Sequence, residues 1–190
     1  MKKIQFARSG YICVSCIFYV AAVIYLLFPT LSAMALCCFS GAILIIYGII
    51  KIVGFFSEDL YCLAFRYDMA FGLLLMVVGV LLLIKNISVA QYLTPGLGWM
   101  ALLDSVFHIQ MAKEAQDFGI KSWKLVLGLS IAAGILSVLL IIRGFPSPQA
   151  TRILTCIVLL ACGAINHYIV RIMVYFPPRS ASKEADNSIL

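Results

Sequence analysis

Apolar residues occur along the chain in six long runs that are separated by shorter polar stretches. A helix needs about 20 residues to cross the roughly 30 Å hydrocarbon core of a bilayer. Because backbone groups in lipid must be hydrogen-bonded within their own segment, runs of this length are predicted to be helices. The pattern predicts an all-α, six-helix transmembrane bundle, with helices over residues 11–28, 31–56, 69–84, 89–111, 123–142 and 153–176.

The connections between these segments alternate in length and charge. Three of them are tight turns with few charges, at residues 29–30, 85–88 and 143–152. The other two, at 57–68 and 112–122, are longer and carry most of the acidic residues. Joining the segments across each tight turn predicts three repeated helical hairpins, at about 11–56, 69–111 and 123–176.

A comparison of the hairpins supports an internal repeat. Tyr47-Gly48, Leu103-Asp104 and Cys162-Gly163 recur at nearly equal intervals, each near the middle of the second helix of its hairpin. A fixed period of this kind is typical of repeat architectures. We therefore expect one membrane domain over residues 1–176. The tail over residues 177–190 is rich in Ser, Pro and charge, and is expected to be a disordered cytoplasmic end.

Composition excludes a soluble monomer. Hydrophobic residues make up 64% of the chain and charged residues only 12%, whereas soluble domains have about 45–50% and about 25%. The net charge of +6 comes from basic residues between apolar runs, where they orient helices in a membrane. The expected partner is therefore the lipid bilayer, with a homo-oligomer left open, and no nucleic acid is expected.

The distribution of Lys and Arg predicts the orientation. With the N-terminus inside, eleven of these residues lie on the cytoplasmic side and only Lys85, Arg143 and Arg152 on the other. The positive-inside rule then predicts a multi-pass protein of the bacterial inner membrane with both termini cytoplasmic. Lys2-Lys3 and Ala33-Met34-Ala35 imitate a secretory signal, but the apolar run between them is too long and is interrupted by a proline.

The seven cysteines are dispersed and have no histidine at ligand spacing. Cys13 and Cys16 have the C-x-x-C form, but a lone pair on a helix is a weak metal or redox signal. Packing is the favoured role for all seven, and no metal or cofactor is expected. No G-x-S-x-G, H-E-x-x-H or phosphate-binding motif occurs, so the chain is expected not to be an enzyme.

Ionisable side chains inside membrane segments are costly, so each one suggests a functional site. Asp104 and His108 are one turn apart on one helical face, where their side chains can meet. The repeat places His167 opposite His108, with Asn166 beside it and Arg171 one turn further on. These five residues form the candidate intramembrane polar cluster.

Three interpretations of this cluster remain open. The residues can hydrogen-bond across the bundle in a purely structural role, with Arg171 and Lys51 extending their heads to the interface. Alternatively, they can respond to protons, because the unperturbed pKa of histidine near 6.5 makes it the side chain most easily charged in mild acid. A proton-coupled transport or conduction pathway is the third interpretation.

Glycine and leucine patterns also suggest a family. The segments GAILIIYGIIKIVGFF, FGLLLMVVGVLLLIKN and WKLVLGLSIAAGILSVLLI make residues 11–176 resemble the HdeD family of bacterial membrane proteins. That resemblance implies a fold of short repeated membrane hairpins and a role in acid or envelope stress resistance. The second hairpin departs most from this pattern. Asp104 stands where the repeat suggests glycine, and the turn has Lys85-Asn86 in place of a proline.

Overall fold

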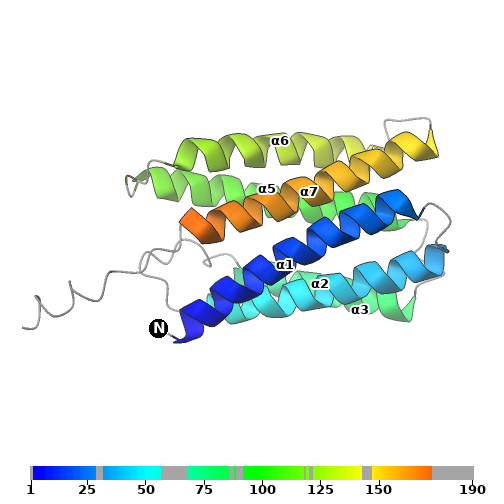
Figure 1. Ribbon diagram of the computed structural model, residues 1–190, viewed down its shortest axis with the longest axis horizontal. Coiled ribbons are helices and arrows are strands. Elements are labelled where there is room, and N and C mark those ends of the chain that lie inside the picture. Colours follow the sequence, from blue (N-terminus) through cyan, green and yellow to red (C-terminus); the bar gives the residue numbers. More distant parts are fainter. Residues whose placement is uncertain are drawn as a thin grey trace, which may run out of the picture.

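The computed structural model describes residues 2–28, 32–56, 68–85, 88, 92–117, 119, 122–142 and 147–172. Within them, six long helices follow one another: α1 (Lys2–Leu27), α2 (Ala33–Phe55), α3 (Asp68–Ile84), α5 (Leu93–Asp117), α6 (Trp123–Ile141) and α7 (Pro148–Ile172). They run alternately in opposite directions through one bundle (Figure 1), so α1 begins and α7 ends at the same end. We call this the termini end. The predicted all-α, six-helix fold is confirmed.

Local chemistry explains where two of the helices begin. Ser32 precedes α2, and its hydroxyl accepts a hydrogen bond from the Ala35 amide at 3.2 Å. Ser147 does the same for Ala150 at 3.1 Å, so α7 begins at Pro148, before the expected start at position 153. Proline is favoured in the first turn because its missing N–H would have no helical partner there.

The apolar surface of the bundle suits a membrane. Four stretches are long and apolar enough to cross a bilayer: Ser9–Leu27, Met34–Phe55, Trp123–Ile141 and Pro148–Val170. Met69–Ile84 is also apolar but shorter. In α5 the polar residues Asp104, Ser105 and His108 lower the hydropathy, and all three are buried inside the bundle. The chain is therefore a multi-pass membrane protein.

The closest helix packing lies between neighbouring hairpins. The most extensive contacts join α2 to α3, α5 to α6, and α7 to α1, whereas α1 and α2 of the first hairpin touch much less. The last pair joins the first and last helices of the bundle, because α7 packs on α1 as α2 packs on α3. The hairpin is thus the unit of the repeated sequence, and the pair formed across two hairpins is the unit of packing.

Glycines bring the backbones of α2 and α3 together. A Cβ atom on Gly48 would lie 2.6 Å from the carbonyl oxygen of Gly72, and one on Gly41 would lie 2.9 Å from that of Gly79. Each glycine thus faces another across the interface, two helical turns from the next such contact. Small residues at such spacing are the usual way in which lipid-embedded helices approach closely.

The same small positions recur in the other two helix pairs. A Cβ on Gly98 of α5 would lie 3.2 Å from the Ser137 carbonyl oxygen of α6. The Cys156 thiol of α7 donates to the Ala22 carbonyl oxygen of α1 at 3.3 Å. Gly41, Gly98 and Cys156 are therefore equivalent positions of the three repeats. In this packing register Asp104 is equivalent to Tyr47. The sequence comparison had instead aligned Tyr47 with Leu103, the residue before Asp104.

The cysteines of the described residues form no disulfide bond. Cys13 and Cys16 are exposed on the lipid side of α1, and Cys37, Cys156 and Cys162 are buried among packed helices. Cys62 lies outside the described residues, as does the tail over 177–190.

Candidate functional site

Asp104 lies at the centre of a buried polar network that joins α2, α5 and α7. The Tyr47 hydroxyl of α2 lies 3.2 and 3.3 Å from the two carboxylate oxygens of Asp104 and donates to them. Asn166 of α7 donates through Nδ2 to the Tyr47 oxygen at 2.8 Å. One tyrosine, one carboxylate and one amide thus hold three helices together. We call the five residues Tyr47, Lys51, Asp104, His108 and Asn166 the Asp104 network.

Lys51 of α2 forms the counterion of Asp104. Its Nζ lies 3.4 Å from Asp104 Oδ1, and the whole residue is only 3% exposed. The expectation that Lys51 extends to the membrane interface is therefore wrong. Lysine is seldom buried unless it is paired, and here the carboxylate supplies the partner.

Aromatic rings from three helices surround the Lys51 ammonium. Its Nζ lies 5.0 Å from the ring centroid of Tyr47, 5.2 Å from that of Phe71 and 5.5 Å from that of Tyr11. A cation within about 6 Å of a ring face is attracted by the ring quadrupole. The rings of α1, α2 and α3 thus partly replace the water that Lys51 loses on burial.

His108 is the more distant member of the Asp104 network. Its Nδ1 lies 3.9 Å from Asp104 Oδ2, one helical turn along α5. That distance is within range of an ion pair if the imidazole is protonated, but is too long for a direct hydrogen bond. The expected contact of the two side chains is therefore present, with Lys51 and Tyr47 closer to the carboxylate.

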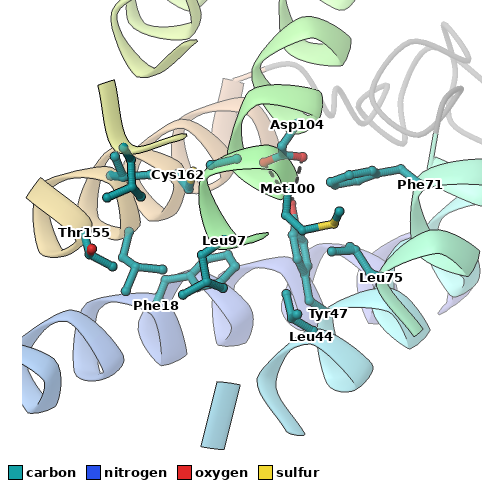
Figure 2. A pocket seen from close by; sticks show the side chains of 14 residues that line it. Phe18, Leu44, Tyr47, Phe71, Leu75, Leu97, Met100, Asp104, Thr155 and Cys162 are labelled. Atoms are coloured by element: carbon teal, nitrogen blue, oxygen red, sulfur yellow. Dashed lines mark hydrogen bonds between the residues drawn. The ribbon is translucent and has the colours of Figure 1, made fainter. Parts of the chain in front are cut away.

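A small cavity adjoins the network on the side away from the termini end. Its volume is about 40 Å³, enough for at most a few water molecules. Figure 2 shows Tyr47 extending from α2 toward Asp104, with Phe18, Leu75 and Leu97 beside them. Apolar side chains make up most of the lining, so the network is enclosed by packed side chains.

The repeat arranges the polar residues in two layers across the bundle. Tyr47, Asp104 and Cys162 occupy equivalent positions of the packing register, and all three line the cavity. One helical turn further along each helix come Lys51, His108 and Asn166, which are also buried. Each layer takes one residue from α2, one from α5 and one from α7, so the network surrounds the axis of the repeat.

This register explains which expected site residues come together. Asp104, His108 and Asn166 do, but the packing places Asn166 and not His167 opposite His108. His167 is half-buried, and among the described residues its buried Nδ1 has no hydrogen-bond partner. Arg171 falls in the last turn of α7, and its side chain lies outside the described residues.

Sequence reasoning missed Tyr47 and Lys51 as members of the site. A signal for Lys51 existed, because it is a charged residue inside the apolar run 31–56 and such residues usually face the bundle interior. The sequence marks Tyr47 only as a point of the repeat. Nothing in its neighbourhood separates it from a tyrosine that faces lipid, so only the contacts with Asp104 and Asn166 identify its role.

Protonation would change this arrangement in a defined way. If Asp104 takes up a proton, Lys51 loses its counterion while it remains surrounded by aromatic rings. An unpaired buried charge costs several kcal/mol. The pairing of Lys51 therefore depends on the ionised form of the Asp104 carboxyl group.

A short repeat of unknown function, DUF308, matches the chain twice, over residues 13–84 and 70–142. The first match covers most of α1 and all of α2 and α3, and the second covers α3, α5 and α6. No curated protein and no solved structure matches the chain at a significant level. The interval between the starts of the two matches equals the interval from Tyr47 to Asp104. The family repeat and the helix packing therefore have the same register. The chain therefore belongs to the family of membrane proteins built from the DUF308 short repeat.

Proposed function

We propose that the protein is a non-enzymatic, HdeD-like protein of the bacterial inner membrane that serves in resistance to acid or envelope stress. The observation that carries this proposal is the Asp104–Lys51 ion pair, with both side chains 4% exposed in the core of an apolar bundle. A buried ion pair adds little to stability compared with apolar residues of the same size. Its presence here is better explained by a response to protons.

The groups that face Asp104 support a proton response. Tyr47 and Lys51 approach it from α2 and His108 from its own helix. Acidification that neutralises the carboxylate leaves the positive charge of Lys51 unbalanced in the enclosed site. Packed side chains keep water from solvating this charge. We therefore expect acid to loosen the contact between α2, α5 and α7 and to alter the cytoplasmic end of the bundle.

Growth of a deletion strain across external pH tests this role. We expect the strain to grow normally at neutral pH, to survive acid poorly and to be rescued by the wild-type chain. The variant Lys51→Met with Asp104→Asn keeps the Tyr47 hydrogen bond but removes both charges, so it should insert normally and fail to rescue. Full rescue by this double variant, at matched membrane levels, would contradict the proposal.

A proton-coupled transporter or channel is the second candidate, because the cavity beside Asp104 lies on the axis of the repeat. This function requires a connected polar path. The cavity walls, which include Phe18, Leu75 and Leu140, are mostly apolar and favour the stress role instead. Proteoliposomes carrying an internal pH dye separate the two. The stress role predicts no protein-dependent proton flux under a pH gradient.

The orientation is part of the proposal and can be tested separately. Reporters fused after Ser188 or within residues 112–122 should report cytoplasm, and a reporter within 143–152 should report the outside. The Lys and Arg distribution is the reason for this expectation. Alkaline phosphatase and green fluorescent protein fusions give opposite signals at each site, so a reversed pattern would show the orientation to be wrong.

A further inference from the structure

Arg152 is a partly buried cation in the second turn of α7. Among the described residues, its buried Nε atom has no hydrogen-bond partner. A buried donor of this kind requires an explanation, and a bound ion is one of them. Lys51 is also buried, but it has Asp104 as its counterion. The two cations of the bundle therefore differ in what balances their charge.

Arg152 belongs to a layer of the repeat at the end of the bundle opposite the termini end. One helical turn before the equivalent positions of the three helix pairs, α2 carries Cys37, α5 carries Thr94 and α7 carries Arg152. The Tyr25 hydroxyl of α1 is within hydrogen-bonding reach of Thr94. It also lies within electrostatic range of Cys37 and Arg152. Four helices thus meet at Tyr25, and we call Tyr25, Thr94 and Arg152 the Arg152 layer.

The electrostatics of this end favour an anion. The helices α2, α5 and α7 all begin here, and none of them has an acidic residue in its first turn. Their N-terminal backbone N–H groups carry partial positive charge. No Asp or Glu occurs in the segments that join the helices at this end, which are 28–33, 85–92 and 142–147. Asp104 lies ten residues beyond Thr94 in α5, or about 15 Å along the helix. This end of the chain therefore provides no carboxylate for Arg152.

We propose that the Arg152 layer binds an oxyanion, which is the carboxylate or phosphate group of a solute or of a lipid headgroup. The planar guanidinium of arginine matches these groups, because its N–H donors can contact two oxygens at once. The hydroxyls of Tyr25 and Thr94 add two further possible donors. Both side chains are partly exposed, so an anion can reach the layer from its own end of the bundle. The site does not depend on Asp104 or on the proposed role in acid resistance.

Thermal unfolding of the full-length protein in a neutral detergent tests the site. An anion that binds only the folded chain raises the unfolding midpoint as its concentration rises. Inorganic phosphate is titrated in one arm and a short-chain phosphatidylglycerol in the other, with sodium chloride added to keep the ionic strength constant. A rise with inorganic phosphate identifies a free anion as the ligand. A rise with the lipid alone identifies a headgroup.

Arg152→Gln removes the charge and keeps a polar side chain. We expect it to weaken binding of the effective probe by about tenfold or more, because hydrogen bonds to a charged group are lost. Thr94→Val should weaken binding by a smaller factor, since it removes one neutral donor. Lys85→Gln is the matched control. It removes an exposed lysine at the same end of the bundle, and it should change the affinity by less than about twofold.

Helical circular dichroism before heating checks that each variant is folded. Arg152→Lys keeps the charge without the planar fork and replaces Arg152→Gln if that variant does not fold. Stabilisation of the wild type by either probe, weakened at position 152 and not at position 85, supports the proposal. A wild-type chain that neither probe stabilises overturns it, as water then satisfies Arg152. Equal effects of Arg152→Gln and Lys85→Gln also overturn it, because binding then follows net charge alone.

Discussion

Replacing Asp104 by Asn should destabilise the folded protein by about 3–5 kcal/mol, because it leaves the Lys51 charge buried without a counterion. The amide can still accept the Tyr47 hydrogen bond, so the loss reports the charge and not the hydrogen bond. Unfolding of the purified protein in detergent, followed by helical circular dichroism, measures the difference. Asp117→Asn removes an exposed carboxylate from the end of the same helix and is the matched control.

The double variant Lys51→Met with Asp104→Asn separates the pair from the general cost of mutation. Removing both charges should recover most of the stability lost by Asp104→Asn, since buried ion pairs are often replaceable by neutral side chains. The Asp117 control is expected to stay within about 0.5 kcal/mol of the wild type. If Asp104→Asn alone is as stable as the wild type, then Lys51 is not held as a buried charge.

Gly48→Ala should destabilise the bundle by about 1–3 kcal/mol, because the added methyl group meets backbone that cannot move aside. Its Cβ would lie 2.6 Å from the Gly72 carbonyl oxygen, so α2 and α3 must separate. Unfolding in detergent again gives the free-energy difference.

Gly96→Ala is the control for this effect. It lies in α5 and has open space around the added atom. An alanine in a helix is favoured over glycine by up to about 1 kcal/mol, so this variant should be as stable as the wild type or more so. Equal effects of the two substitutions would show that close contact of α2 and α3 does not hold the bundle together.

The helices and their repetition could be predicted from the sequence, because apolar runs of about 20 residues have only one structural solution in lipid. The pairing of helices could not. Tight turns such as 29–30 suggest that the helices they join are the closest neighbours, yet Gly48 and Gly72, across the longer connection 57–68, pack more tightly. Backbone approach depends on which small residues face each other, and the length of a connection does not determine that.

The candidate site could be predicted in part. Asp104, His108 and Asn166 stand out as polar residues in apolar segments, and they do come together. The sequence comparison placed His167 in the position that Asn166 occupies, and a shift of one residue turns a helical side chain by about 100°. Only contacts between helices determine which residues of the repeats are equivalent. The glycines packed between α2 and α3 provide such contacts.

The charge state of Asp104 is the most direct test of the buried ion pair and of its response to acid. Infrared difference spectra between the wild type and Asp104→Asn, in lipid and at a series of pH values, isolate the signal of this one carboxyl group. We expect a carboxylate band at neutral pH, which is replaced by a protonated carboxyl band when the sample is made acidic. A protonated carboxyl band already present at neutral pH would contradict the ion pair with Lys51, and with it the proposed response to acid.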